Sequence, residues 1–492
     1  MVTPRRTLSA LACALVLAGC ATGPDYRKPQ VDMPAAWTPE APWRPMQPQD
    51  AIARGPWWER FGDVQLNALQ QQALAGNQTL AIASARLSQA RAQLDVVSAG
   101  QYPQASIGAR ASRLRISGNR PLTNYNSPNY ATVQNDFALG LNVSYELDLF
   151  GRVKRSVEGA AASAEQSAAD FENTRLLLSA DLASNYFNLR ELDIELDVVT
   201  RAIALQRRAL ELAASRHDLG ATSGLDVAQQ QALLDNTLTQ VDILGKQRAQ
   251  YEHAIATLTG TPAPQFSIAP STAAIAFPAI PLGVPSDVLE RRPDIASAER
   301  AMAAANAQIG VASAAFYPSL MLQPSYGVDS RNWGSLFNAP SVLWSLGVSA
   351  TQSLFDAGRL RAGVDFTKGG YEAAVATYKR TVLTAMQEVE DGITGIASLD
   401  RAYAQSQSAI ASARRVLDLA NSRYDGGVTP YLDVITAQQS LLNSERQAAQ
   451  LMGQRLLTSV FLIKALGGDW HERRDAPSQA GPVAEPGKPD AS

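Results

Sequence analysis

Apolar and polar residues alternate along part of the chain. From Phe137 to Leu149 every odd position is apolar, whereas the even positions between them are small, polar or acidic. A second alternating stretch includes Leu346 and Val348. Strict alternation is typical of a β-strand whose two faces meet different surroundings. We therefore expect strands at about 134–149 and 342–354.

Two weaker alternating stretches precede these strands, at about 104–116 and 319–329. Pro324 lies within the second stretch and cannot donate a ladder hydrogen bond. Strands of about ten residues have the length of tilted strands that cross a membrane. Two soluble hairpins with one wet face would produce the same alternation, so the pattern by itself leaves both alternatives open.

Long segments that lack proline separate and follow the strands, and they predict helices. A helix of 65 residues would be about 100 Å long, and helices of more than about 25 residues are typical of bundles or coiled-coil-like packing. Leu176, Ala180, Ala183 and Phe187 are spaced as one buried helical stripe. The expected helices cover residues 65–100, 152–217, 225–259, 285–316, 359–424 and 431–466.

The order of elements occurs twice along the chain. Residues 77–103 match residues 292–318 at a constant offset of 215, and Gly151 matches Gly358 at an offset of 207. A period of this length is too long for a solenoid repeat and indicates two duplicated halves. We assign the first repeat to 65–260, an equatorial linker to 261–284 and the second repeat to 285–468.

Four strands per chain are too few to close a barrel, because the smallest outer-membrane barrels have about eight. Lipid also tolerates no open sheet edge, since unpaired backbone groups find no water there. If the strands cross a membrane, copies of the chain must therefore join. Two copies would supply eight strands and three would supply twelve, and this count does not choose between them.

The first residues have the pattern of a bacterial lipoprotein signal. Arg5 and Arg6 precede a short apolar stretch that ends in Leu17-Ala18-Gly19-Cys20, which resembles a lipobox. We expect cleavage of 1–19 and a diacylglycerol and an N-acyl chain such as palmitate on Cys20, several chains being needed for stable anchoring. An ordinary signal peptide with a chance cysteine is the alternative. The residues after Cys20 lack the aspartate typical of inner-membrane retention, which favours the outer membrane.

Residues 20–64 are rich in proline and tryptophan, which predicts an extended segment lying against another surface. The tail 469–492 is expected to be disordered. The chain has 43 Lys and Arg against 46 Asp and Glu, a formal net charge of −3, which argues against nucleic acid as a main partner.

The sequence contains no motif typical of an enzyme active site or of a metal site. Cys13 and Cys20 are the two cysteines of the chain, so a disulfide framework or a cysteine-based zinc site is excluded. The three histidines are scattered, and no HExxH, P-loop or GxSxG pattern occurs. We expect no catalytic residue, no metal and no cofactor apart from the lipid on Cys20.

Several motifs in combination resemble the TolC-type outer-membrane efflux channel family, in its OprM- or NodT-like lipoprotein branch. The likeness extends from Cys20 to about Gly468. Its motifs are Gly-Pro-Asp-Tyr at 23–26, Trp-Trp-Glu-Arg-Phe-Gly-Asp at 57–63, Asp-Leu-Phe-Gly-Arg at 148–152, Glu-Arg-Arg-Pro-Asp-Ile at 290–295 and Tyr-Pro at 317–318.

The resemblance implies an α+β membrane protein that forms a homotrimer. Its twelve-stranded β-barrel, with four strands from each chain, would sit in outer-membrane lipid and continue into a long periplasmic α-helical barrel. The implied function is the passive exit duct of a tripartite efflux system, with a periplasmic adaptor and an inner-membrane pump, expected to be of RND type, as partners. A type I secretion duct and a structural coiled-coil lipoprotein without a pore are the alternatives.

The turns at 216–226 and 423–433 are the candidate periplasmic tips. Asp226 and Asp433 occupy equivalent places, and three chains would bring six carboxylates, which favour cations, around a pore. The resemblance implies that these aspartates line the constriction, with Tyr424 in their bonding network. Capping of a helix start is an equally weighted alternative for both aspartates.

The chain departs from the family pattern at two places near the tips. Thr429 stands where some members have a bridging arginine, and Thr436 where some have a further aspartate, so we expect the closed state to be held differently. Four glycines fit tight turns that would meet the adaptor, although turn geometry alone also explains them. They are Gly220, Gly224, Gly426 and Gly427.

Overall fold

The structure is a computed structural model, and it describes residues 22–28, 56–119, 131–278, 280 and 292–468. The expected signal segment 1–19, the acylation site Cys20 and the tail 469–492 lie outside the described residues, as does most of the proline-rich segment.

The chain divides into two compact units. The first unit comprises residues 1–32, 78–174 and 297–384. The second unit comprises residues 33–77, 175–296 and 385–492.

The first unit contains a four-stranded sheet and the helical segments next to it in sequence. Its strands are β1 (Gln104–Ile116), β2 (Thr132–Leu147), β3 (Ser319–Ser330) and β4 (Val342–Thr351). Its helices are α3 (Gln78–Ser98), most of α7 (Pro293–Ala314) and the first parts of α4 (Arg152–Asp218) and α8 (Arg359–Asp425), with short 3-10 turns η3 (Ala99–Gln101), η5 (Trp333–Ser335) and η6 (Ala339–Ser341).

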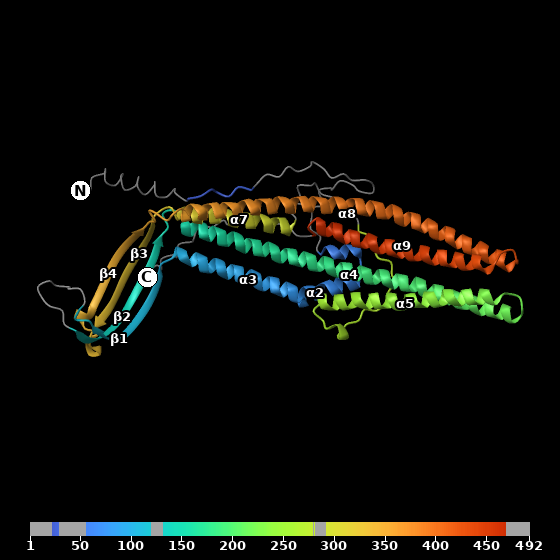
Figure 1. Cartoon of the computed structure of the whole chain (residues 1–492), viewed down its shortest axis with the longest axis horizontal. Coiled ribbons are helices and arrows are strands. Elements are labelled where there is room, and N and C mark those ends of the chain that lie inside the picture. Colours follow the sequence, from blue (N-terminus) through green and yellow to red (C-terminus); the bar gives the residue numbers. More distant parts are fainter. Residues whose placement is uncertain (1–21, 29–55, 120–130, 279, 281–291, 469–492) are drawn as a thin grey trace, which may run out of the picture. The chain divides into compact units, whose positions relative to one another are not determined.

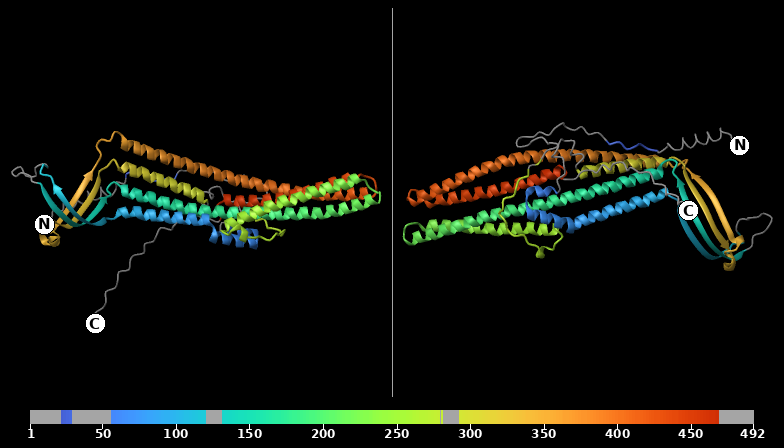
Figure 2. Two further views of the ribbon diagram at one scale, coloured as in Figure 1. Left: turned by 60° about the horizontal axis from the view of Figure 1, so that its bottom comes forward. Right: turned by 180° about the vertical axis from the view of Figure 1, so that it is seen from behind.

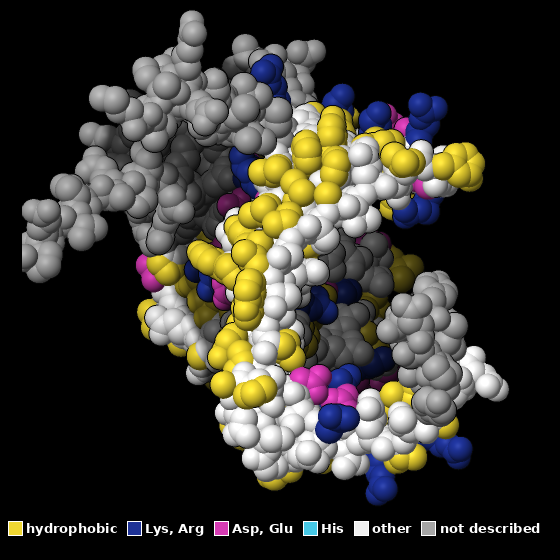
Figure 3. All heavy atoms as spheres, turned by 90° about the vertical axis from the view of Figure 1, so that its left-hand side faces the viewer, with side chains coloured by type: hydrophobic (Ala, Val, Ile, Leu, Met, Phe, Trp, Pro, Cys, Tyr) yellow, Lys and Arg dark blue, Asp and Glu magenta, His cyan; other side chains and the backbone are white. Residues whose placement is uncertain are grey.

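The strands form one curved antiparallel sheet in the order β1-β2-β3-β4 (Figures 1 and 2). Residues that face each other across the strands share the apolar side, as in the row Ile107, Leu141, Tyr326 and Trp344. This face is largely exposed in a single chain, and hydrophobic side chains cover the sheet in Figure 3. The expected alternation is thus confirmed, because the register joins the apolar positions of all four strands.

Pro324 interrupts one ladder without ending its strand. The pairs of β2 with β3 run from Phe137 to Asn142 and resume at Tyr145, and the gap lies at the position of Pro324. The missing N–H of proline accounts for this gap. Because β3 still pairs with β4 through Pro324 and Leu346, the strand continues from Ser319 to Ser330.

The second unit is built from helices that run side by side. It contains η2 (Trp57–Phe61), α2 (Val64–Gly76), α5 (Gly224–Leu258), η4 (Ala263–Gln265), α9 (Tyr431–Ala465) and the later parts of α4 and α8. In both views of Figure 2, α5 lies along α4 and α9 along α8. Leu192 and Val199 of α4, Leu244 of α5 and Leu442 of α9 belong to one buried hydrophobic cluster.

The predicted stripe on α4 is buried, since Ala183 and Phe187 are fully inaccessible. Phe187 packs against Phe61 with ring centroids 4.7 Å apart. Trp57 and Trp58 of the tryptophan-rich segment are also buried. This part of the segment is a 3-10 turn, not extended chain, and it packs on the helices as the tryptophans predicted.

The expected helix over 65–100 is wrong in one respect, because it is two helices. Asn77 separates α2 from α3 with an extended backbone, φ −72° and ψ 125°, and its side-chain amide donates to the Leu258 carbonyl at 2.8 Å. Gly260, in the left-handed region with φ 74°, lies directly against Gly76. These contacts with residues about 180 positions away in the chain end α2.

Smaller differences concern the ends of other elements. β2 covers Thr132–Leu147 and not 134–149, and β4 ends at Thr351 and not at 354. The helix expected over 285–316 begins at Pro293, a residue suited to a first helical turn, while 281–291 lie outside the described residues. Among the helices in the described part of the chain, none combines the length and apolar character that crossing a bilayer requires.

Candidate functional site: the helix turns and their support

The two candidate turns of the second unit connect α4 to α5 and α8 to α9. Gly220 and Gly427 adopt left-handed backbone angles, with φ of 76° and 69°, so these two turns require glycine. Gly224 starts α5 beside the His217 ring, and a Cβ there would lie 3.6 Å from that ring. Gly426 is not among the glycines with a left-handed φ. Turn geometry therefore explains two of the four predicted glycines, and the adaptor contact stays a prediction for all four.

Asp226 caps the start of α5. Its carboxylate accepts hydrogen bonds from the Thr222 hydroxyl and, at 3.4 Å, from the Ser223 backbone N–H. The Ser223 hydroxyl accepts in return from the Asp226 N–H at 3.3 Å, which completes a capping box. The capping alternative for Asp226 is therefore what the structure contains.

Asp433, the equivalent residue of the second repeat, lies in a different environment. It is exposed in the first turn of α9, whose start at Pro430 has no side-chain cap. In the described part of the chain its carboxylate has no hydrogen-bond or ion-pair partner. Asp226 and Asp433 occupy equivalent positions in the repeat, but only the Asp226 carboxylate is hydrogen-bonded among the described residues. The role of both carboxylates in a pore stays a prediction.

Tyr424 joins the two turns. Its hydroxyl lies 3.4 Å from the Thr222 hydroxyl, and its ring lies 4.9 Å from that of Tyr431. The Arg216 guanidinium sits 5.3 Å from the centre of the Tyr424 ring and forms an ion pair with Asp425 at 3.0 Å. Arg216 and Asp425 therefore connect the end of α4 to the end of α8.

Arg216, Asp425 and Tyr431 belong to this cluster although the sequence did not predict a role for them there. One signal was available in the repeat, because Tyr424 and Tyr431 correspond at the offset of 207 to His217 and Gly224. A pair of aromatic rings in one half thus replaces a histidine and a glycine in the other. The contact of the His217 ring with Gly224 is the first-repeat version of the tyrosine pair.

Tyr431 links the turns to the interior. Its hydroxyl donates to the side-chain oxygen of buried Gln230 at 3.1 Å, and the Gln230 amide donates to the Gln206 carbonyl at 3.1 Å. Burial raises the pKa of Tyr431 to about 12, so the phenol stays neutral and keeps its proton to donate.

The two threonines expected to depart from the family pattern do not join the turns through their side chains. The Thr429 hydroxyl is buried and has no partner among the described residues. The Thr436 hydroxyl donates to the Leu432 carbonyl of its own helix at 2.8 Å. The connection between the turns therefore comes from Arg216 and Tyr424 instead.

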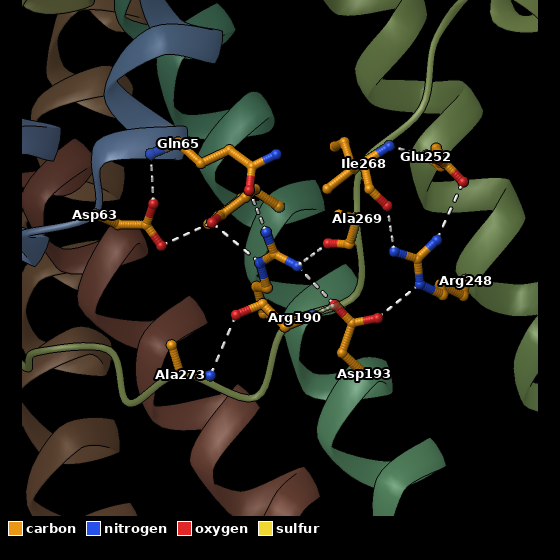
Figure 4. A network of polar contacts seen from close by, with 11 residues as sticks. Asp63, Gln65, Arg190, Asp193, Arg248, Glu252, Ile268, Ala269 and Ala273 are labelled. Carbon is orange, nitrogen blue, oxygen red and sulfur yellow. Dashed lines mark hydrogen bonds and ion pairs between the residues drawn. The ribbon is translucent and has the colours of Figure 1, made fainter.

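A buried polar network supports the same unit (Figure 4). Asp193 of α4 accepts from Arg190 at 2.7 Å, from Arg248 of α5 at 2.6 Å and from the Ser271 N–H at 3.0 Å. The two arginines also donate to the carbonyls of Ala269 and Ile268, at 2.9 and 2.7 Å. The equatorial linker is thus fixed to α4 and α5 through its backbone.

The network extends to the start of α2. Arg190 donates to the Tyr186 hydroxyl at 3.0 Å, and Tyr186 donates to Asp63 at 2.7 Å. Asp63 caps α2 by accepting from the Gln65 and Leu66 N–H groups, both at 2.9 Å. The last residue of the motif 57–63 is therefore a helix cap, and burial raises the pKa of the Tyr186 phenol that bonds to it.

In the first unit, the motif at 23–26 is bound between α4 and α7. Arg155 forms an ion pair with Asp25 at 2.7 Å, and this contact lowers the pKa of the Asp25 carboxyl. The Gly23 backbone lies so close to Gly310 that a Cβ on Gly23 would approach the Gly310 Cα to 2.6 Å. Lys28 forms an ion pair with buried Glu299 at 2.8 Å. These contacts explain why the motif combines a glycine with an acid.

In the part of the chain that the structure describes, no group of three or more His, Cys, Asp and Glu residues is placed to hold a metal ion. The polar clusters instead consist of arginine–carboxylate pairs, as at Asp193 and Asp425. Such pairs hold segments together and connect helices, and they provide no nucleophile paired with a general base.

Comparison with known proteins shows extensive similarity. The family model "Outer membrane efflux protein" matches residues 69–261 and 284–468. The pyoverdine export outer membrane protein OpmQ of Pseudomonas aeruginosa is 32% identical over 472 residues, which cover 95% of this chain and 98% of that protein. The toluene efflux pump outer membrane protein TtgC of Pseudomonas putida is 32% identical over 484 residues, or 97% and 99% of the two chains.

Among solved structures, the outer-membrane channel OprN matches with a TM-score of 0.81 and 30% identity, over 91% of this chain and 99% of that chain. The two segments matched by the family model coincide with the two repeats. The fold class expected from the sequence, with four strands and long helices in two repeats, is confirmed.

Proposed function

Because the chain belongs to the outer membrane efflux protein family, we propose that three copies of it assemble into the exit duct of a tripartite efflux system. At the level of the family, the chain is an outer-membrane efflux channel that extends into the periplasm, and it is not an enzyme. The alternative of a structural lipoprotein without a pore is therefore set aside.

The open sheet of the single chain is the observation that supports a trimer. β1 and β4 are edge strands, so each has a row of backbone groups without a strand partner in the described chain, while the apolar face spans all four strands. Lipid excludes such edges, because the unpaired N–H and C=O groups find no water there. Pairing of β4 with β1 of the next copy removes both edges, and three copies give twelve strands.

The repeat predicts the register of that seam. The hairpin pair Gln104–Ser144 becomes Ser319–Thr351 when 215 is added to the first number and 207 to the second. Applying the same offsets to the central pair Leu147–Leu320 places Leu354 opposite Ala105 of the next copy. This register keeps the apolar positions on one face, whereas a slip of one residue would reverse them.

The end of β4 supports this seam. The last residues of β2, from Tyr145 to Leu147, pair with β3 beyond the end of β1. Their counterparts, 352–354, lie beyond the end of β4 in the single chain, and Leu354 is 93% exposed although Leu147 is half-buried. We expect β4 to lengthen to Leu354 when the neighbouring β1 is present.

Cysteine cross-linking tests both the seam and the number of copies. Ser353→Cys combined with Ser106→Cys places two thiols at paired positions of adjacent copies, and oxidation should yield a covalent trimer on non-reducing gels. The matched control, Ser353→Cys with Ser112→Cys, separates the thiols by about 20 Å along the strand and should not cross-link. A covalent dimer as the largest product, or equal yields from both pairs, would contradict the proposal.

We place the closed end of the duct at the two helix turns. The Arg216–Asp425 ion pair and the Tyr424–Thr222 contact hold the turns of each chain together, and the free carboxylate of Asp433 lines the constriction. The tip glycines Gly220, Gly224, Gly426 and Gly427 form the surface for a periplasmic adaptor, and the adaptor connects the duct to an inner-membrane pump of RND type.

We assign Cys20 as the acylated first residue of the mature chain. Cys20 lies outside the described residues, but Thr22 is bound to the turn between β2 and α4, where its N–H and hydroxyl both donate to the Phe150 carbonyl at 3.2 and 2.9 Å. Acyl chains two residues away would enter the lipid beside the sheet. Mass spectrometry of the N-terminal peptide should find three acyl chains' mass on Cys20 and none in Cys20→Ala.

The cargo is a small organic molecule. The relatives OpmQ and TtgC are named for export of pyoverdine and efflux of toluene, and small organic molecules are the class that these names share. Deletion of the gene should raise the sensitivity of the cell to compounds of this class, and the intact chain should restore it.

A further inference from the structure

Most apolar rows of the sheet end at one level toward its loops, and Val133, opposite Arg115 beyond that level, is the exception on β1 and β2. The last apolar row contains Ala111 of β1, opposite Phe137 of β2. Phe137 in turn faces Ser330 of β3, so the polar level begins there as well. β2 and β4 lead into the long helices at their other ends, and these helices extend into the periplasm, so the loop end of the sheet faces the exterior.

An aromatic pair marks this boundary. The rings of Phe137 and Trp333, the latter on the η5 turn between β3 and β4, meet edge to face at 5.7 Å, and Trp333 is 67% exposed. Tryptophan beside an apolar surface is typical of the level of lipid headgroups in outer-membrane proteins.

Two arginines lie directly beyond the boundary on the same face. Arg113 and Arg115 follow Ala109 and Ala111 at alternate positions of β1, so their side chains leave the sheet on its apolar side. Both are exposed, and neither has an ion-pair partner in the described part of the chain. An unpaired arginine on a lipid-facing surface is tolerated near the interface, where phosphate groups are present, and is unfavourable deeper in the membrane.

Arg110 shows that this arrangement is specific to one face. It lies on the opposite side of β1 and forms an ion pair with Asp136 of β2 at 2.6 Å. The charge of Arg110 is thus neutralised within the chain, whereas Arg113 and Arg115 on the lipid face have no such partner among the described residues. Asn135, exposed and directly opposite Arg113, adds an amide donor to them.

We propose that Arg113 and Arg115, with Asn135, form a binding site for the phosphate groups of lipids in the outer leaflet of the outer membrane. Residues two apart on one face of a strand are about 7 Å apart, so both guanidinium groups can reach one phosphorylated headgroup. Guanidinium groups bind phosphate oxygens through two parallel N–H donors, which lysine does not provide. The site holds the outer rim of the sheet at the headgroup level.

Lipid binding to the purified full-length protein in detergent tests this site. The protein is titrated with diphosphorylated lipid A, and native mass spectrometry measures the fraction that retains lipid. The affinity for lipid A should be about thirtyfold lower in the variant Arg113→Gln/Arg115→Gln than in the parent protein. The matched control Arg110→Gln removes one arginine from the other face of the same strand and should leave lipid binding unchanged. Equal affinity of the double variant and the parent would overturn the proposal.

A second measurement needs no variant. Lipid A without phosphate groups should bind the parent protein about thirtyfold more weakly than the diphosphorylated form, and added salt should weaken binding of the latter. A lipid affinity that depends neither on the phosphate groups nor on the salt concentration would reject the site, even if the double variant failed to assemble. The Ser353/Ser106 cross-link reports trimer formation separately, so a failure of assembly is distinguishable from a failure of lipid binding.

Discussion

Arg248 of α5 donates to the carboxylate of Asp193 on α4 at 2.6 Å, and that carboxylate is 1% exposed. Arg190 approaches the same carboxylate from its own helix at 2.7 Å. One buried negative charge thus serves two guanidinium groups that also hold the carbonyls of Ile268 and Ala269. The equatorial linker depends on Asp193 although it contacts that side chain only through the Ser271 N–H.

Substitution of Asp193 should destabilise the second unit strongly. Asp193→Ala leaves the buried Arg190 guanidinium without its carboxylate and leaves Arg248 with its second partner Glu252, at 3.2 Å. Breaking a buried pair in this way costs about 3–5 kcal/mol. We expect a large fall in the thermal midpoint of the detergent-solubilised protein and faster proteolysis within 261–278. Asp197→Ala is the control, because its ion pair with Arg201 is solvent-exposed and such pairs contribute about 0–1 kcal/mol. Similar midpoints for the two variants would contradict this assignment.

Substitution of Asp226 should affect stability, whereas substitution of Asp433 should affect ion conduction. Asp226→Ala removes a capping box and should lower helix stability by about 1 kcal/mol. Asp433→Ala removes no bond in the described chain, so its stability should not change while the cation preference of the channel falls. Thermal melting and reversal potentials in planar bilayers measure the two effects. A cation preference unaltered by Asp433→Ala would reject the gate role of that residue.

Arg216→Ala should open the closed tip with little effect on stability. The Arg216–Asp425 ion pair is partly exposed, so its loss should cost about 0–1 kcal/mol. The contact nevertheless joins the ends of α4 and α8, and we expect higher closed-state conductance in planar bilayers. Arg423→Ala provides the matched control, because Arg423 is the repeat equivalent of Arg216, is exposed and has no side-chain partner among the described residues. Equal conductance of both variants would exclude the clamp.

Glu191 on α4 should make stability depend on pH. Burial, followed by the nearby charge of Glu195, raises the pKa of Glu191 to about 7, and its side chain packs against Gly453 of α9. Glu195 itself is paired with Arg446 of α9 at 2.6 Å, so that arginine is already engaged. A carboxyl whose pKa is raised by folding favours the native state below its ordinary pKa of 4.5, and this contribution is lost as pH rises through 7.

Glu191→Gln removes the charge that forms at high pH. We expect the variant to melt roughly 2–4 °C above the parent at pH 8 and at the same temperature as the parent at pH 5. Comparing variant with parent at each pH cancels the titration of all other groups. A gain of the same size at both pH values would show that the effect comes from packing and not from ionisation.

Local patterns in the sequence contain the elements of this fold. The alternation from Phe137 to Leu149 predicts a strand because side chains leave a strand on alternate faces, and the register of the sheet places those residues in one apolar surface. The offsets of 215 and 207 reveal the two repeats, and they also relate one hairpin to the other pair by pair. The number of strands per chain, and hence the need for further copies, follows from the same patterns.

Those local patterns could not predict contacts between residues far apart in the chain. Asn77 ends α2 by bonding to Leu258, and no local signal at residue 77 announces that partner. Asp226 and Asp433 look equivalent in sequence, but the neighbouring Thr222 and Ser223 bond only the first. Arg216, Arg190 and Arg248 read as ordinary charged residues of long helices.

The sequence by itself therefore determined which segments form strands and helices, their duplication and the family to which the chain belongs, because periodicity and motifs are properties of neighbouring residues. Only the tertiary structure decided which charges are paired. An ion pair such as that of Arg248 with Asp193 depends on two helices meeting at one level. That meeting is set by packing of the whole unit and leaves no mark on the residues adjacent to either partner.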